Sequence, residues 1–302
     1  MEIGVVGLGR MGANMARRMA RGGARVVAYD RDQAARKALA GERGVDPVEG
    51  LAALAAQLPG ERVVLLMLPA GAPTEDTIAE LLPLLSAGDT IVDGGNAFYK
   101  DTMARALELS QRGLRDIDAG VSGGTHGLAQ GYCLMLGGTP KSIELFEPFA
   151  RILAPEPGVG WLHCGQSGAG HYAKMIHNGI EYGMMQALAE GFALLAARRE
   201  FEFDAGRLAE TWRHGSVVRS WLLDLCAEIL KRDEDLQSVA PVVADSGEGR
   251  WTALEAVELG VPAPVITMAL MARFSSQGGS DYARKLLAMM RASFGGHSIT
   301  RN

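Results

Sequence analysis

The chain has 302 residues, of which 48% are hydrophobic, and it carries a formal net charge of −5. This length and apolar content predict a large core divided between two domains. The negative charge excludes the overall basic surface of nucleic-acid-binding proteins, and the longest apolar stretch, Val261–Ala272, is shorter than the roughly 18 residues of a membrane span.

The cysteines are few and have no metal-binding pattern. Cys133, Cys164 and Cys226 are odd in number, and their spacing matches no zinc motif. The chain opens on a strand-like stretch, and no positively charged leader precedes an apolar run. We therefore expect buried free thiols, no bound metal, no nucleic-acid or membrane partner, and a cytoplasmic location.

Strands and helices alternate through the first half of the chain. The expected strands are Ile3–Val6, Arg25–Tyr29, Arg62–Leu68, Thr90–Val92, Arg115–Asp118, Tyr132–Leu136 and Gly160–His163. Helical segments such as Met11–Arg21 and Thr102–Gln111 lie between them. This alternation predicts an α/β, Rossmann-like doubly wound domain, in which a parallel sheet is covered by helices on both faces.

The second half of the chain is expected to be entirely helical. The first of its helices, His171–Arg199, is Ala-rich and free of proline. The others are expected at Ala205–His214, Val217–Lys231, Thr252–Leu259, Pro264–Ser275 and Asp281–Arg291. We place the boundary near residue 165, so that an α/β domain of residues 1–165 precedes an all-α domain of residues 166–302 with a C-terminal tail.

Small residues form a stripe along the long helix. Gly179, Gly183, Ala187 and Gly191 are spaced by four and share one helical face. Glycine inside a helix costs about 1 kcal/mol relative to alanine. We expect another helix or a ligand to approach closely enough to offset that cost.

A glycine-rich turn follows the first strand and opens a helix. It reads Gly7-Leu8-Gly9-Arg10-Met11-Gly12. The first glycine permits the tight turn, the second lets a pyrophosphate approach the backbone, and the third lets helix and strand pack closely. The helix N-terminus offers N–H groups to the phosphates. In this strand–turn–helix context the motif indicates dinucleotide binding.

The end of the second strand bears on the choice of cofactor. Asp30 can accept hydrogen bonds from the ribose hydroxyls of NAD and would repel the 2′-phosphate of NADP, whereas Arg31 can hold that phosphate. The alternative for Asp30 is a helix N-cap. We favour NAD over NADP. The loops after two further strands, with Leu68, Pro69 and Ala70 in one and Asn96 in the other, are expected to border the nicotinamide.

Five polar residues share one face of the long helix. Lys174, His177, Asn178 and Glu181 lie at i, i+3, i+4 and i+7, and Tyr182 follows at i+8. The simple alternative is a solvated stripe with a Lys–Glu pair. Against it, the flanking residues are small or apolar, which indicates a buried helix carrying functional groups.

This helix resembles the catalytic helix of the decarboxylating 6-phosphogluconate dehydrogenases. The matching run is Lys174-Met175-Ile176-His177-Asn178-Gly179-Ile180-Glu181-Tyr182. The resemblance extends over nearly the whole chain, through the Gly7 loop, Val92–Asn96, Ser122–Gly124, Asp245–Thr252 and Arg291–His297. The length resembles the short, NAD-preferring bacterial class of the β-hydroxyacid dehydrogenase superfamily.

The resemblance implies an oxidative decarboxylation of 6-phospho-D-gluconate to D-ribulose 5-phosphate and CO2 in the pentose phosphate pathway. It implies that Lys174 takes the C3 hydroxyl proton as hydride leaves C3, and that Glu181 later protonates C1 of the enediol. An amine acts as a base only in its neutral form, which burial favours.

The resemblance also implies a set of substrate ligands. The carboxylate and hydroxyls would be held by Asn96, Ser122, Gly123, Gly124, His177 and Asn178. The phosphate would be held by Tyr182, Arg250, Thr252 and Arg273. Arg291 and His297 resemble a C-terminal pair that reaches the neighbouring subunit's site, which implies a homodimer or higher homo-oligomer. From the residues alone, we would expect Arg291 to be an ordinary cation near a helix end and the tail to be disordered.

Two departures from the family pattern leave alternatives open. Arginine replaces the commoner lysine at position 250, and Thr125-His126 follows the Ser-Gly-Gly turn where long enzymes carry acidic residues. The nearest rival function is a β-hydroxyacid dehydrogenase that acts on a small hydroxy acid without decarboxylation. That enzyme would not need Arg250, Arg273 and Arg291. A non-catalytic nucleotide sensor would not need the Lys174–Glu181 pair.

Overall fold

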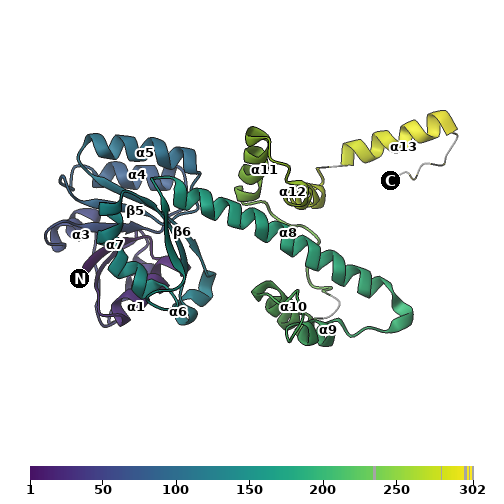
Figure 1. Cartoon of the computed structure of the whole chain (residues 1–302), viewed down its shortest axis with the longest axis horizontal. Coiled ribbons are helices and arrows are strands. Elements are labelled where there is room, and N and C mark those ends of the chain that lie inside the picture. The colour runs from purple at the N-terminus through teal and green to yellow at the C-terminus, as the bar shows by residue number, and fades with distance from the viewer. Residues whose placement is uncertain (234–235, 280, 296–297, 299, 301–302) are drawn as a thin grey trace. The chain divides into compact units, whose positions relative to one another are not determined.

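The computed structural model describes residues 1–302 except 234–235, 280, 296–297, 299 and 301–302. The chain forms two compact units, Met1–Met175 and Ile176–Asn302. The first unit holds the sheet, the second is helical, and helix α8 (Ala169–Ala197) begins in the first and continues into the second (Figure 1). The boundary expected near residue 165 coincides with the end of the last strand, whereas the first compact unit continues to Met175.

The first unit is built on an eight-stranded sheet with the order β3-β2-β1-β4-β5-β6-β7-β8. The strands are β1 (Glu2–Val6), β2 (Arg25–Tyr29), β3 (Val45–Pro47), β4 (Val63–Leu66), β5 (Thr90–Asp93), β6 (Arg115–Ser122), β7 (Cys133–Gly138) and β8 (Trp161–Gly165). The order reverses between β1 and β4, as it does in doubly wound sheets. The sheet therefore confirms the expected Rossmann-like class.

The sheet is mostly parallel, as expected, but it contains one antiparallel pair of strands. β6 and β7 pair antiparallel, whereas the other neighbours pair parallel. The segment between Ser122 and Cys133 holds only short helical turns, η1 (Gly124–His126) and α6 (Gly127–Gln130). A parallel crossover needs a dozen or more residues, so this connection returns the chain in the opposite direction.

Two hydrophobic cores lie on opposite faces of the sheet. Side chains alternate along each strand, so Val5 belongs to one core and Val6 to the other. The first core holds residues of α1 and α7, and the second holds residues of α3, α4 and α5. The helices of this unit are α1 (Arg10–Arg21), α2 (Gln33–Lys37), α3 (Leu51–Gln57), α4 (Ala72–Leu81), α5 (Tyr99–Gln111), α6 and α7 (Pro140–Leu153).

The second unit is helical throughout the part of it that is described. After a short turn η2 (Arg199–Phe201), its helices are α9 (Ala205–Trp212), α10 (Trp221–Arg232), α11 (Glu248–Leu259), α12 (Pro264–Ser276) and α13 (Asp281–Gly295). Leu188 and Phe192 of α8 pack against α9 and α10, and Tyr182 packs against α11 and α12. The long helix α8 thus supports two helix pairs.

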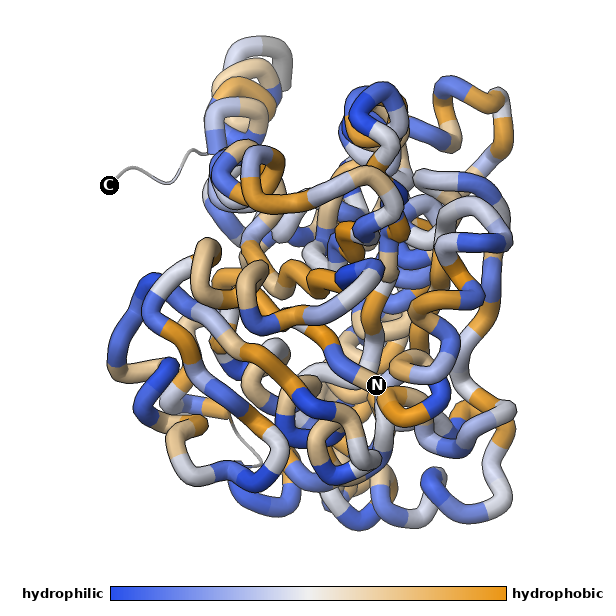
Figure 2. Tube along the Cα trace, turned by 90° about the vertical axis from the view of Figure 1, so that its left-hand side faces the viewer, coloured by the Kyte–Doolittle hydropathy of each residue, from blue (hydrophilic) through white to orange (hydrophobic). Residues whose placement is uncertain are grey.

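Within the described part of the chain, no helix is long and apolar enough to cross a membrane. Figure 2 shows hydrophilic residues interspersed with hydrophobic ones along the trace.

Candidate functional site

The glycine-rich turn has the geometry that dinucleotide binding requires. Gly7 has φ +92°, and a Cβ there would lie 2.5 Å from the Met67 carbonyl oxygen. A Cβ on Gly12 would lie 1.9 Å from the Gly7 carbonyl oxygen, so α1 packs directly against the turn. A Cβ on Gly9 would meet nothing within 4 Å, and α1 begins there without a side-chain cap. This end of α1 is open to a phosphate group.

Asp30 contacts the same turn from the end of β2. Its carboxylate accepts hydrogen bonds from the N–H groups of Leu8, at 2.6 Å, and Asp32, at 2.8 Å. The N-cap of α2 is Asp32, whose side chain accepts the Ala34 N–H. The alternative role for Asp30 as a helix cap therefore belongs to its neighbour. Arg10 and Arg31 are both exposed.

The two loops beyond β4 and β5 pack against each other. A Cβ on Gly95 would lie 2.7 Å from the Leu68 carbonyl oxygen. The carboxylate of Asp93 accepts the Gly95 N–H and pairs with buried Arg105. Leu68 is half-buried, whereas Pro69, Ala70 and Asn96 are exposed. These loops lie at the carboxyl ends of neighbouring strands, where doubly wound sheets bind their ligands.

The Ser-Gly-Gly turn ends strand β6. The strand continues four residues beyond its expected end at Asp118, to Ser122. Gly123 and Gly124 have φ of +127° and +52°, values that favour glycine. Asn14 of α1 reaches the Thr125 carbonyl oxygen at 3.4 Å, and His126 is exposed.

The polar face of α8 is largely buried. Lys174 is 7% exposed, Asn178 8% and Tyr182 5%. His177 and Glu181 are half-buried, with 3.8 Å between His177 Nδ1 and Glu181 Oε2, and His177 Nδ1 lies 3.2 Å from Asn178 Oδ1. A solvated polar stripe would leave all five residues exposed, so that alternative is wrong.

Helix α8 approaches its neighbours closely where the glycine stripe begins. A Cβ on Gly179 would lie 2.6 Å from the Thr252 side chain, and one on Gly183 would lie 3.1 Å from Val265. Helix–helix contact with α11 and α12 therefore accounts for these two glycines. A Cβ on Gly191 would meet nothing within 4 Å, so close helix contact does not account for this glycine, which lines an apolar cavity.

Three of the four expected phosphate ligands contact the same loop of the helical unit, residues 244–246. The Arg273 guanidinium lies 3.5 Å from the centroid of the Tyr182 ring. Arg250 donates to Asp245 at 2.7 Å, and its guanidinium lies over the Phe274 ring.

Thr252 has a different environment from those three residues. It is buried, and its hydroxyl donates to the Glu248 carbonyl oxygen within α11 at 2.8 Å. The C-terminal pair is only partly visible: Arg291 is exposed on α13, and His297 lies outside the described residues.

The structure adds polar residues whose roles the sequence did not single out. Ser246 lies 3.1 Å from the Tyr182 hydroxyl and donates to buried Glu248. Burial raises the pKa of Asp245, but the Gly247 N–H and Arg250 outweigh this effect, so the pKa lies below the usual 3.8. Ser246, Glu248 and Asp245 all fall in the Asp245–Thr252 segment. Glu248 and Asp245 contact neighbours within this segment, whereas the contact between Ser246 and Tyr182 joins residues 64 positions apart.

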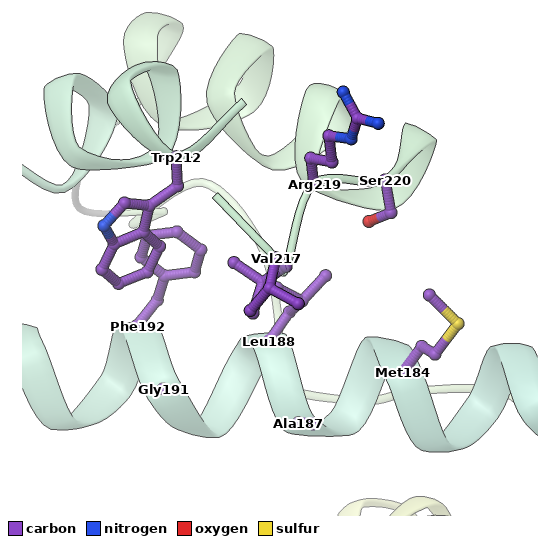
Figure 3. Close-up of a pocket in the computed structure, with 10 residues that line it drawn as sticks. Met184, Ala187, Leu188, Gly191, Phe192, Trp212, Val217, Arg219 and Ser220 are labelled. Carbon is purple, nitrogen blue, oxygen red and sulfur yellow. The ribbon is translucent and has the colours of Figure 1, made fainter. Parts of the chain in front are cut away.

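An apolar cavity of about 400 Å³ lies farther along α8, beside the end of α9 and the segment before α10 (Figure 3). Its lining includes Met184, Leu188, Phe192, Trp212 and Val217. The Phe192 and Trp212 ring centroids are 5.7 Å apart. The lining is almost wholly apolar, so the cavity lacks the groups that acid–base chemistry needs.

The three cysteines are free, but the expectation that they are buried is wrong: Cys133 is exposed, and Cys164 and Cys226 are only partly buried. Burial raises the pKa of the Cys164 and Cys226 thiols. Within the described part of the chain, no group of three or more His, Cys, Asp or Glu side chains could hold a metal ion.

Two family models match the chain in order. The NAD binding domain of 6-phosphogluconate dehydrogenase matches residues 2–164, and the C-terminal domain of 6-phosphogluconate dehydrogenase matches residues 170–300. The chain belongs to the 6-phosphogluconate dehydrogenase family.

Named relatives agree with the family models. The chain is 40% identical to the NAD(+)-dependent, decarboxylating 6-phosphogluconate dehydrogenase of Haloferax volcanii, over 100% of this chain and 99% of that protein. It is 37% identical to an NADP(+)-dependent, decarboxylating enzyme of Bacillus subtilis, over 91% of this chain and 61% of that protein.

A solved structure shares the fold. The 6-phosphogluconate dehydrogenase of Plasmodium falciparum, studied in its apo form and with NADP+ and 6-phosphogluconate, matches with a TM-score of 0.83 and 28% identity. The match covers 100% of this chain and 66% of that one. The chain thus spans about three fifths to two thirds of the longer relatives and the full length of a short one.

Proposed function

We propose that this protein catalyses the oxidative decarboxylation of 6-phospho-D-gluconate to D-ribulose 5-phosphate and CO2, with NAD as the preferred hydride acceptor, as a step of the pentose phosphate pathway. The observation that carries the proposal is the burial of Lys174 against Gly120, on the strand that ends in the Ser122–Gly124 turn. A buried amine beside a turn rich in backbone N–H groups suits proton abstraction from a hydroxy acid. The family membership supplies the substrate class.

The residues around the glycine-rich turn fit a dinucleotide. The open end of α1 at Gly9 suits the pyrophosphate, and the carboxylate of Asp30 suits the ribose hydroxyls. A 2′-phosphate beside Asp30 would meet a negative charge, which favours NAD over NADP. When bound, NAD supplies the acceptor for the hydride that leaves C3.

Lys174 and Glu181 have complementary roles on one helix. Neutral Lys174 takes the proton of the C3 hydroxyl while hydride leaves C3, and the C–O bond becomes a ketone. The resulting β-keto acid loses CO2, because the ketone accepts the electron pair of the breaking C–C bond. Glu181 then gives a proton to C1 of the enediol, which yields the product ketose.

The remaining polar residues hold the substrate. Ser122, Gly123 and Gly124 offer a hydroxyl and backbone N–H groups to the carboxylate and hydroxyls, together with Asn96, His177 and Asn178. Arg250, Arg273 and Tyr182 suit the phosphate, because guanidinium groups bind phosphate through paired N–H donors. Arg250 is held by Asp245, so the substrate phosphate would have to compete with that carboxylate.

Replacing Lys174 tests the proposed base. Lys174→Ala should lower kcat by about 100- to 10,000-fold, the usual contribution of a general base. NAD binding, measured by titration, should stay the same, because the glycine-rich turn is intact. The control is Lys141→Ala on α7, which also removes a lysine; unlike Lys174, Lys141 is exposed. Turnover of Lys174→Ala equal to that of Lys141→Ala would remove Lys174 from this role.

We also propose that the working unit is a homodimer or a higher homo-oligomer. Large apolar side chains on the helical unit are exposed, including Val257 at 81%, Val265 and Met268 at 66% and Tyr282 at 80%. Exposed apolar surface of this extent marks an interface. We assign this surface to a second copy of the chain.

A further inference from the structure

The first turn of α8 is held by a buried carboxylate. Asp118 of β6 is 0% exposed, and its two oxygens accept the N–H groups of Gly168 and His171, each at 2.7 Å. A helix N-terminus leaves its first N–H groups without partners inside the helix, and a negative charge there is stabilising. Asp118 therefore fixes where α8 begins.

Backbone atoms of α8 and the sheet approach each other without intervening side chains. A Cβ on Gly170 would lie 2.3 Å from the Met135 carbonyl oxygen and 2.5 Å from that of Asp118. A Cβ on Gly120 would lie 2.5 Å from Lys174 Cβ and 2.7 Å from the Gly170 carbonyl oxygen. Real Cβ atoms essentially never come this close, so α8 can occupy this place only because these residues are glycines.

A second tie fixes the rotation of the helix. His171 is 2% exposed, and its Nδ1 lies 2.8 Å from the hydroxyl oxygen of buried Thr102 on α5. His171 precedes Lys174 by three residues, so their side chains lie on neighbouring positions of one helical face. A rotation of α8 that moved Lys174 would break the contact with Thr102.

One face of a single strand connects these features. Ile117, Ala119 and Val121 of β6 point into the hydrophobic core on the α7 side. Asp118, Gly120 and Ser122 alternate with them and share the opposite face. Along that face the strand anchors α8, leaves room for Lys174 and ends in the Ser-Gly-Gly turn.

We propose that Asp118 and His171 are positioning residues, which act by holding Lys174 at a fixed place above β6. The inference rests on the proposed function, because it assigns them to the base of that reaction. A displacement of about 1 Å in a reacting group can cost about 100-fold in rate. The positioning pair therefore affects catalysis without touching substrate or cofactor.

The test compares kcat per cofactor-binding site between variants. This normalisation removes the effect of any loss of folded protein. Asp118→Asn keeps one acceptor and should lower kcat by about 10- to 100-fold while KM for 6-phosphogluconate changes less than about threefold. Asp118→Ala keeps no acceptor and should lower kcat further. Thr102→Val removes the hydroxyl at His171 with little change in volume and should lower kcat by about 3- to 10-fold.

Asp89→Asn is the matched control. Asp89 is 2% exposed and also accepts two backbone N–H groups, from Arg62 and Ser86, each at 2.8 Å. Asp89 directly precedes β5, whereas the glycine-rich turn follows the carboxyl end of β1, at the other edge of the sheet. Asp89→Asn should therefore lower the melting temperature and leave kcat unchanged.

The outcomes separate the two proposals. Wild-type protein that fails to oxidise 6-phosphogluconate contradicts the proposed function. If the wild-type protein is active, the comparison between variants tests the positioning role. Equal kcat per site in Asp118→Asn, Thr102→Val and Asp89→Asn would contradict that role and leave the proposed function standing. If Asp118→Asn does not fold, Thr102→Val decides the matter by the same comparison.

Discussion

At the scale of single residues, Asp30 and Asp32 have different roles. Asp32 caps α2, while Asp30 binds the Leu8 N–H and presents its charge at the end of β2. Asparagine at position 30 loses the charge but keeps one acceptor oxygen, which is enough for the hydrogen bond from the Leu8 N–H, although not for the second one from the Asp32 N–H.

We expect Asp30→Asn to raise the ratio of kcat/KM for NADP to that for NAD by about 10-fold, which corresponds to about 1.4 kcal/mol of relieved repulsion. Steady-state kinetics with both cofactors measures the ratio. Asp32→Asn, which alters the cap, is the control and should leave the ratio unchanged. An equal ratio in wild type and Asp30→Asn would show that Asp30 does not select the cofactor.

At the scale of elements, β6 combines an apolar face with a face of acidic residues and glycine. Asp116 shares the second face with Asp118, and its Oδ2 is buried without a hydrogen-bond partner among the described residues. Burial raises the pKa of Asp116 above the usual 3.8, although a hydrogen bond from Ser167 opposes this effect. Its charged form is therefore less stable in the folded protein than in the unfolded chain.

The sign of the resulting pH dependence follows by linkage. The contribution of Asp116 to stability is fully present below pH 3.8 and is lost as pH rises through its raised folded-state pKa. The melting temperature of Asp116→Asn relative to wild type should therefore increase between pH 4 and pH 7.

Glu61→Gln should show the opposite trend, which makes it a useful control. The hydrogen bond from Arg115 and its charge lower the pKa of Glu61 below 4.5, so its contribution to stability grows as pH rises. Thermal unfolding at several pH values checks both variants. A difference between Asp116→Asn and wild type that does not vary with pH would contradict the assignment.

Local patterns predicted much of the fold and the site, whereas contacts between distant residues could not be predicted. The glycine-rich turn and the polar face of α8 depend on spacing within a dozen residues, so the sequence alone indicates them. The edge strand β3, Val45–Pro47, has too few residues to show a periodicity and was missed. The ties of Asp118 to α8 and of Ser246 to Tyr182 join residues about 50 and 64 positions apart, which no local pattern encodes.

At the scale of the whole molecule, many large apolar side chains are exposed among the described residues of the helical unit, and we assign this surface to a second copy. Light scattering should give a mass of at least twice 32.0 kDa at micromolar concentration. Introducing charge with Val265→Lys and Met268→Lys should dissociate the assembly, since a charge without a partner is costly in an interface.

Leu107→Lys is the control for that experiment. Leu107 is 63% exposed on α5 of the first unit, so its replacement should leave the mass unchanged. A wild-type protein with the mass of one chain would contradict the oligomer.

The central claim is tested most directly by the stoichiometry of the reaction. Wild-type protein is mixed with 6-phosphogluconate and NAD, and NADH absorbance and released CO2 are followed together. We expect equal amounts of NADH and CO2, formed at the same rate. Formation of NADH without CO2 would instead identify a β-hydroxyacid dehydrogenase that does not decarboxylate, and no reduction of either NAD or NADP would contradict the proposed function altogether.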